Sequence, residues 1–110
     1  MEVSDKFGPI RKGLLELAVL NIISAQKVYA ANILDTLSKT DFATQEGTLY
    51  PLLSRLRREG LVEYEWTESV SGPPRKYYSL TNKGSTELKT LKDYWEKIND
   101  TINKLGDGKP

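Results

Sequence analysis

The sequence predicts a mainly α-helical fold with one small β-hairpin, an α+β domain that ends in a long C-terminal helix. Three observations predict this class. Leucines recur at helical spacing between Leu49 and Leu56, apolar and polar residues alternate from Val62 to Thr67, and an apolar repeat of spacing 3-4-3-4-3 begins at Leu88. A chain of 110 residues has room for one domain with a modest core.

The first expected helix runs from Ile10 to Ser24 and is apolar around most of its circumference. Such a helix must be covered on more than one side, and a domain this small has little left to cover the second side. We therefore expect a second subunit to pack against Leu14 and Leu15. A short second helix is expected from Tyr29 to Ser38, where apolar residues again fall at helical spacing.

The third expected helix follows Thr44, which suits an N-cap, and ends at Gly60, which suits the left-handed residue of a helix stop. Leu61 would then fold back onto Leu56, as in a Schellman motif. The leucines of this helix define its buried side. The outward side is narrow near its start and cationic near its end, and it consists of Gly47, Pro51, Ser54 and Arg58, flanked by Thr44, Tyr50 and Arg55.

A β-hairpin is expected after this helix. Its first strand alternates Val62, Tyr64 and Trp66 with polar residues, which predicts one dry and one wet face. The turn is expected at Ser71-Gly72-Pro73-Pro74 and the second strand at Arg75 to Leu80. The second strand is cationic where it begins, whereas the charges of the first are all acidic. The two signs are therefore separated locally, although the formal net charge of the chain is only +1.

Thr81 is expected to cap a long last helix. Its apolar residues keep the spacing of a coiled-coil seam for most of three heptads, until Gly106 stops the helix. We expect it to lie against a partner's first and last helices in a homodimer. The expected interface consists of Leu14, Leu15, Leu88, Leu91, Trp95, Ile98, Ile102 and Leu105. The predicted divisions are a helix and hairpin domain at 7–81, a dimerisation helix at 82–105 and a tail at 106–110.

The residue types exclude most enzyme chemistries. The chain has no cysteine and no histidine, which removes disulfides, thiolate and imidazole metal ligands, and every nucleophile that depends on a histidine. The acids are scattered singly, so we expect no enzyme, no cofactor and no metal site. The apolar run of the first helix is interrupted by Glu16 and Asn21 and is too short to span a bilayer. We therefore expect a cytoplasmic protein without a membrane partner.

The order of helix, helix, helix, hairpin and helix is that of a winged helix-turn-helix. The segments Gly47-Thr48-Leu49-Tyr50-Pro51-Leu52-Leu53 and Arg75-Lys76-Tyr77-Tyr78-Ser79-Leu80-Thr81 narrow the resemblance further. Together with Glu59-Gly60-Leu61, they resemble the PadR family of bacterial transcriptional regulators from about Leu14 to Leu105. The single C-terminal helix is similar to that of the smaller subgroup of this family. The resemblance implies a regulator whose partner is double-stranded operator DNA.

The DNA contacts follow from this resemblance together with the basic hairpin. By amphipathicity alone, the third helix more often only covers a core; the coupled hairpin and the resemblance favour insertion of its N-terminal half into the major groove. The expected contacts from this helix and its cap are Thr44, Gln45, Thr48, Tyr50, Pro51, Ser54 and Arg55. On the hairpin, Arg75 and Lys76 are expected at the DNA backbone or minor groove, with Gly72 and Pro73 shaping the tip.

The expected function is a homodimeric, sequence-specific repressor that occupies promoter DNA. Trp95 lies in the middle of the seam, where it is either dimer core or one wall of a slot for a small planar apolar effector that relieves repression. The resemblance to regulators that sense small aromatic or lipophilic compounds adds weight to the slot. The alternative function is a winged-helix module that binds another protein and no DNA, supported by the near-zero net charge and the acidic first strand.

Overall fold

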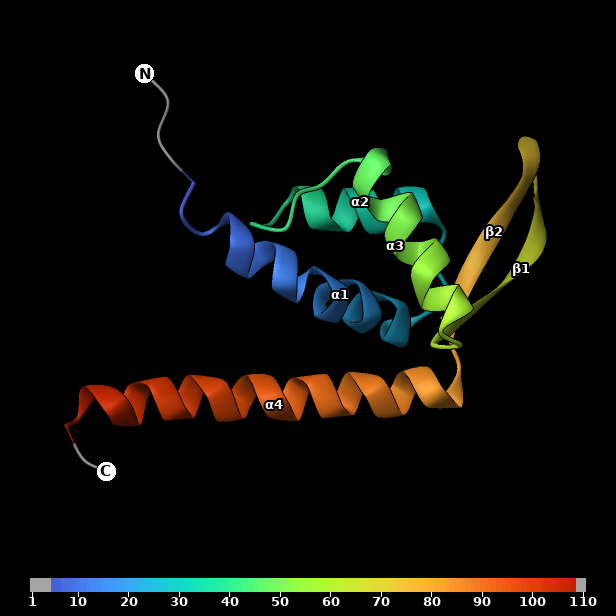
Figure 1. Ribbon diagram of the computed structural model, residues 1–110. Helices are drawn as coiled ribbons and strands as arrows, with labels where there is room; N and C mark the ends of the chain where they lie inside the picture. The colour runs from blue at the N-terminus through green and yellow to red at the C-terminus, as the bar shows by residue number, and fades with distance from the viewer. Residues whose placement is uncertain (1–4, 109–110) are drawn as a thin grey trace, which may run out of the picture.

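The computed structural model describes residues 5–108 of the chain. Its elements are α1 (Gly8–Ala25), α2 (Ala30–Ser38), α3 (Glu46–Arg58), β1 (Val62–Ser69), β2 (Gly72–Leu80) and α4 (Asn82–Gly106), as Figure 1 shows. This order confirms the α+β winged-helix fold that the sequence predicts. The predicted tail at 106–110 falls partly on residues 109–110, which lie outside the described residues.

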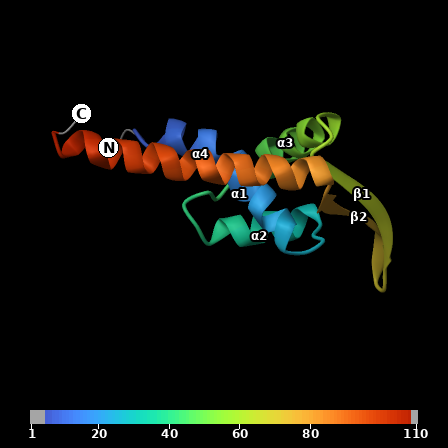
Figure 2. The same cartoon turned by 90° about the horizontal axis from the view of Figure 1, so that it is seen from below.

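α1 lies between the other helices and forms the middle of the domain. α2 and α3 lie on one side of it and α4 on the other, and α4 runs back along α1 in the opposite direction (Figure 1). The view in Figure 2 shows α4 alongside α1, with the hairpin projecting at one end of the molecule. The two helices diverge toward the C-terminus of α4, so the distal part of α4 has little of its own domain to pack against.

The core sits where α1, α2, α3 and the base of the hairpin meet. Its side chains are apolar, and none of the buried residues among those described is polar or charged by type. The leucine side of α3 is buried as predicted, with Leu52 half-buried at its edge. The fully buried side chains are Val19, Leu20, Ile33, Leu49, Leu53, Leu56 and Val62. Each contributes about 1.5–3 kcal/mol by leaving water, and together they seat α3 in a fixed orientation.

The hairpin, which we call the wing, differs from the prediction at its turn. The connection is Val70-Ser71, and β2 already begins at Gly72, where it pairs with Ser69. The sequence places Gly72-Pro73-Pro74 in the turn because proline lacks an N–H and favours turns. Close to the tip and opposite a register shift between Thr67 and Ser69, however, these prolines need not donate to the ladder. The pairing of Gly72 with Ser69 and of Arg75 with Thr67, one before and one after the prolines, then keeps this segment extended.

The predicted dry face of β1 loses its cover along the strand. Val62 is buried and Tyr64 is half-buried, but Trp66 is 63% exposed. The alternation is therefore correct while the burial is not, because the wing leaves the core between the second and third of these residues. Tyr77 and Tyr78 of β2 face opposite sides, because successive residues of a strand alternate, and Tyr78 is the buried one.

An isolated β-bridge anchors the wing. Val28, in the connection between α1 and α2, forms an isolated antiparallel bridge with Tyr78. The N–H of Tyr78 donates to the carbonyl oxygen of Val28 at 2.7 Å, and the N–H of Val28 donates in return at 3.2 Å. The sequence analysis treats this connection only as a linker. The bridge ties the base of the wing to the helical part of the domain.

The ends of α3 agree only partly with the prediction. The N-cap is Gln45 and not Thr44, because the helix begins at Glu46, and no side chain caps it. The C-terminal stop is confirmed: Gly60 has a φ of 78°, and the N–H of Leu61 donates to the carbonyl oxygen of Leu56 at 2.9 Å. These are the geometry and hydrogen bond of a Schellman motif.

α4 begins as predicted at a Thr81 cap, whose hydroxyl accepts a hydrogen bond from the N–H of Gly84 at 2.9 Å. Leu88 is one of the expected seam residues. It is 7% exposed and belongs to the core of its own domain, so little of its surface is left for a partner. Leu91 is half-buried, and apolar exposure increases from Trp95 onward.

Candidate nucleic-acid interface

α3 presents its predicted outward side to solvent. Four residues of that side are exposed: Gly47, Pro51, Ser54 and Arg58. Tyr50 flanks them toward the wing and is 47% exposed. Thr48 flanks them on the side of α1. At the start of the helix, Gln45 is exposed, whereas Thr44 is half-buried in the preceding loop.

A cleft of about 440 Å³ separates this side of α3 from the wing. Tyr50 and Ser54 line it from α3, and Arg75 and Lys76 line it from β2. The start of α2, from Tyr29 to Ala31, forms a further wall. Two of the expected DNA contacts from the helix and two from the hairpin therefore meet across one cleft, although they are far apart in the sequence. The others lie outside it: Thr48, Pro51 and Arg55 border a separate hollow beside α1.

The two cations of the wing rest on aromatic rings. The guanidinium of Arg75 lies 4.4 Å from the ring centre of Tyr29. The ammonium of Lys76 lies 4.5 Å from the ring of Tyr64 and 5.4 Å from that of Trp66. Contacts of this kind hold a cation over a ring face while leaving its N–H groups available. The wing thus presents two oriented positive charges at the cleft, and no carboxylate is paired with either among residues 5–108.

Trp66 and Tyr29 belong to this cleft and are absent from the sequence-based site. The sequence does contain an indication of Trp66: it is the last aromatic residue of an alternating strand, at the end that the core no longer covers. Tyr29 reaches the cleft because the Val28 bridge brings the start of α2 beside the wing. Gly72 and Pro73 are exposed near the tip, as the expected tip-shaping role requires.

Arg55 differs from the other expected DNA contacts because its guanidinium group already pairs with two carboxylates of the same chain. Its Nη2 donates to Oε1 of Glu16 on α1 at 2.6 Å, and its Nη1 donates to Oε2 of Glu59 at 2.9 Å. These hydrogen bonds, that of Glu16 foremost, raise the pKa of Arg55 above its ordinary value. Both ends of the guanidinium fork are therefore engaged within the domain.

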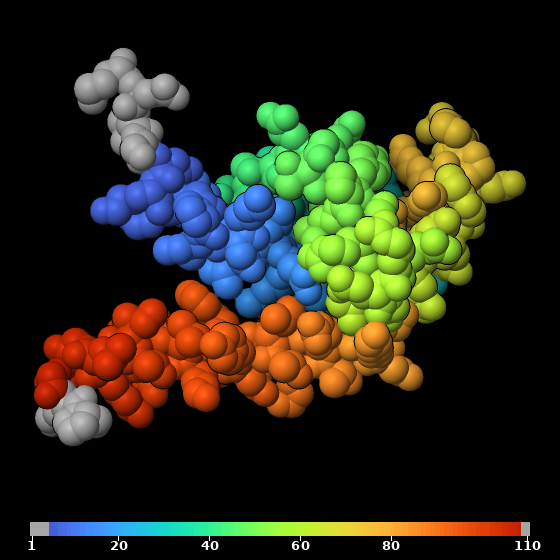
Figure 3. All heavy atoms as spheres, in the orientation of Figure 1, coloured from blue at the N-terminus to red at the C-terminus, as the bar shows by residue number. Residues whose placement is uncertain are grey.

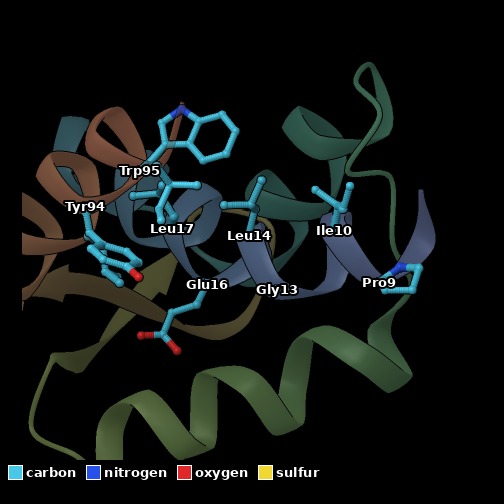
Figure 4. A pocket seen from close by; sticks show the side chains of 10 residues that line it. Pro9, Ile10, Gly13, Leu14, Glu16, Leu17, Tyr94 and Trp95 are labelled. Carbon is cyan, nitrogen blue, oxygen red and sulfur yellow. The ribbon is translucent and has the colours of Figure 1, made fainter. Parts of the chain in front are cut away.

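A second hollow lies between α1 and α4, on the opposite side of α1 from α3. It measures about 390 Å³, and Figure 3 shows it opening between the N-terminal part of α1 and the distal part of α4. Trp95, 43% exposed, and Tyr94 face it from α4, and Leu14 and Leu17 from α1 (Figure 4). Glu16 also borders it, but its carboxylate points away from Trp95. The walls are almost entirely apolar.

A sequence profile described as the Transcriptional regulator PadR-like family matches residues 19–90. This span runs from the buried half of α1, through α3 and the wing, into α4. The chain belongs to the PadR-like family.

Solved PadR-like structures resemble the chain over most of its length. A PadR-like transcription factor from Bacteroides fragilis is 43% identical, with a TM-score of 0.78, over 88% of this chain and 94% of that one. A PadR-like regulator from Bacillus cereus is 39% identical, with a TM-score of 0.82, over 93% and 100% of the two chains. A transcriptional regulator of Mycobacterium tuberculosis is 31% identical over 71% of this chain and 72% of its own length.

As a PadR-like protein, the chain is a transcriptional regulator and not an enzyme, and its partner is DNA. Within residues 5–108, no group of three acidic side chains is placed to hold a metal ion. The helices in that part of the chain are all too short or too polar to cross a membrane.

Proposed function

We propose that the chain is a homodimeric repressor that binds operator DNA through α3 and the wing. The observation that carries this proposal is the cleft in which Tyr50 and Ser54 of α3 face Arg75 and Lys76 of β2. A helix of 13 residues is about 20 Å long and fits the major groove, which is about 12 Å wide. With α3 in that groove, the wing cations reach the flanking phosphates or the adjacent minor groove.

The contacts divide by chemistry. Gln45, Thr48 and Tyr50 carry donors and acceptors at the N-terminal half of α3, where base edges come within reach. Ser54, with Pro51 beside it, lies on the same exposed side of α3 and would face the sugar-phosphate backbone of the DNA. Thr44 precedes the helix and would contact a phosphate at its N-terminus. The wing supplies the salt-dependent part of the affinity, since phosphate contacts release counterions.

The homodimer is proposed from the exposed apolar residues of the distal part of α4. Ile102 is 61% exposed and Leu105 is 71% exposed, and Ile10 at the start of α1 is also exposed. Leu14, Leu15, Leu91 and Ile98 are only half-buried. A second copy whose α4 lies along this surface would cover these side chains and set two copies of α3 about 34 Å apart, one helical turn of DNA.

Relief of repression is proposed at the hollow beside Trp95. Its volume and apolar walls suit a small planar apolar compound. Because the hollow borders both α1 and α4, an occupant that changes their separation would change the spacing of the two α3 helices. The coupling is then reciprocal, so operator DNA weakens effector binding by the factor by which the effector weakens operator binding. Equal affinity of a Trp95-quenching compound with and without operator would contradict this mechanism.

The function is tested by selecting duplexes from a random-sequence pool with the purified chain and titrating the selected duplex with salt. The proposal expects a pseudo-palindrome with half-sites one helical turn apart. It also expects a loss of about 10³–10⁵ in affinity between 50 and 200 mM salt if six to ten phosphates are contacted. A pool from which no sequence is enriched, with no salt-dependent binding, would favour the alternative, a module that docks on another protein.

A further inference from the structure

Glu16 and Arg55 join α1 to α3 across a gap. The carboxylate of Glu16 lies 2.6 Å from Nη2 of Arg55, and the two side chains are only 22% and 42% exposed. Glu59, one turn beyond Arg55, takes the other side of the guanidinium at 2.9 Å. Arg55 is thus bound in a fork by two carboxylates, one on its own helix and one on α1, which is a geometry that lysine cannot reproduce.

This is the only side-chain hydrogen bond between α1 and α3 within residues 5–108. Around it, the space between the two helices is an open hollow of about 500 Å³, bordered by Lys12, Leu15, Thr48 and Pro51. On its other sides α3 packs against α2 and β1, whereas it approaches α1 at few points. The Glu16–Arg55 pair is therefore the polar link that acts on the inclination of α3 toward α1, in addition to the apolar packing of the core.

The position of Glu16 gives this pair its importance. α1 lies between α3 on one side and α4 on the other (Figure 1). The carboxylate of Glu16 points to the side of α1 opposite Trp95 (Figure 4). Because α1 packs against α4, fixing the angle between α3 and α1 also fixes the angle between α3 and the α1–α4 pair. The proposed dimer interface lies on that pair.

We propose that Glu16 is a positioning residue for DNA recognition: by holding Arg55, it fixes the orientation in which α3 enters the major groove. This inference rests on the proposed function, because it assigns a role within DNA binding. It replaces a phosphate contact by Arg55 with an internal one. Arg58, on the exposed side of α3, is then a cation of this helix that is left for the DNA backbone.

The sign of the effect separates this role from simple electrostatics. Glu16→Gln removes a negative charge from a protein that binds a polyanion, which on charge alone should strengthen binding to every duplex. A misplaced α3 should instead weaken binding to the selected duplex only. The expected loss is about tenfold or more, the penalty for one misplaced base contact, with binding to a scrambled duplex of equal length unchanged or stronger.

Glu59→Gln is the matched control. It removes the same charge from the same arginine, but Glu59 lies at the end of α3 itself, so the link between the helices survives. Its ratio of selected to scrambled affinity should stay within about twofold of the wild type, since surface pairs of this kind are weak. Equal ratios for Glu16→Gln and the wild type, or equal losses for the two variants, would overturn the inference.

Arg55→Met distinguishes the positioning role from a phosphate contact. If Arg55 contacts a phosphate, the slope of log affinity against log salt falls by about 0.9. If it acts through Glu16, the slope stays the same while the selected-to-scrambled ratio falls. A lower slope with an unchanged ratio would therefore return Arg55 to the DNA contacts and contradict the proposal.

A measurement without DNA keeps this inference separable from the proposed function. Amide hydrogen exchange along α3 should be faster in Glu16→Gln than in the wild type and unchanged in Glu59→Gln, because only the first variant loses its fastening to α1. Unchanged exchange in both variants would overturn the positioning role even if the wild type binds DNA. A wild-type chain that binds no duplex would defeat the proposed function and the assignment to DNA recognition together. If Glu16→Gln does not fold, Glu16→Asp, which keeps the charge but shortens the reach, is measured in the same way.

Discussion

The hydroxyl group of Thr81 donates a hydrogen bond to the carbonyl oxygen of Gly60 at 2.6 Å. The hydroxyl oxygen of Thr81 also accepts a hydrogen bond from the N–H of Gly84 at 2.9 Å, and the N–H of Thr81 donates to the carbonyl oxygen of Leu61 at 3.1 Å. One threonine therefore joins the end of α3 to the start of α4. Lys83 reinforces the junction by donating to the carbonyl oxygen of Glu59. The orientation of α4 relative to α3 is set at this point.

Replacing Thr81 by valine should destabilise the fold by about 1–2 kcal/mol, the value of an N-cap, because the variant keeps the β-branched shape and loses both hydroxyl hydrogen bonds. The measurement is urea unfolding followed by circular dichroism. Thr86→Val is the control, because the hydroxyl of Thr86 bonds only within α4, to the carbonyl oxygen of Asn82. The control should stay within about 0.5 kcal/mol of the wild type. If the two variants lose the same unfolding free energy, Thr81 does not stabilise the junction of α3 and α4.

Gly84→Ala should be more damaging, by about 3 kcal/mol. A methyl group at this position would overlap the backbone carbonyl oxygen of Leu61, and backbone cannot move aside as a flexible side chain can. Gly106→Ala is the control in the same helix, since a methyl group there would meet no other atom. It should be neutral or stabilising by about 0.5–1 kcal/mol. Thermal unfolding of both variants decides the matter, and a Gly84→Ala variant as stable as wild type would mean that the junction is looser than described.

The double variant Arg75→Ala, Lys76→Ala should lower the slope of log affinity against log salt by about 1.8, because each contacted phosphate contributes about 0.9. Fluorescence anisotropy with the selected duplex at a series of salt concentrations measures this slope. The control removes two lysines from the distal part of α4, Lys97 and Lys104, which lie far from the wing (Figure 1). A slope that falls equally in the control, or not at all in the wing variant, would remove the wing from the interface.

Ile102→Lys should dissociate the proposed homodimer. Ile102 is already 61% exposed, so the charge does not disturb the fold of a single subunit. In the dimer each copy would lose about 1.5–3 kcal/mol of burial, which raises the dissociation constant at least about 100-fold. Sedimentation equilibrium gives the constant. Asn103→Lys, with the same charge on an exposed neighbouring residue, should change it little. A wild-type chain that sediments as a single subunit would contradict the dimer itself.

Stability should decline at alkaline pH through Tyr78. Burial, foremost, raises the pKa of this phenol above its ordinary value of 10.0. Because the folded-state pKa is the higher one, the stabilisation is complete below the unfolded-state pKa and is lost as pH rises through the folded-state pKa. Melting temperatures measured upward from pH 9 should fall more steeply for the wild type than for Tyr78→Phe, which keeps the ring and cannot ionise. Parallel curves would show that Tyr78 does not carry this dependence.

Local patterns predict most of the fold. Gly60 and Thr81 act where their chemistry places them, because helix stops and caps depend on a few neighbouring residues. The turn of the wing is misplaced because Pro73 and Pro74 favour a turn locally, while cross-strand pairing decides otherwise. Leu88 keeps the seam spacing, but periodicity does not reveal which part of a seam the chain's own domain covers.

The sequence predicts the candidate site less completely, because the site depends on distant residues. Glu16 and Arg55 are 39 residues apart, and nothing near either one indicates that they pair. Tyr29 joins the cleft only through the bridge that brings its segment to the wing. The residues that were predicted, among them Tyr50 and Arg75, lie on elements whose exposed faces are readable from alternation and helical spacing alone.

The bridge between Val28 and Tyr78 has a consequence for how the wing docks. A free two-stranded finger would lose about 1–2 kcal/mol of conformational entropy for each residue that becomes ordered on a surface. With β2 fastened near its base, that penalty is confined to the residues toward the tip. In the proposed complex with DNA, the fastened part of the wing would not mould itself to each duplex and would discriminate among duplexes by the width and curvature that they already have.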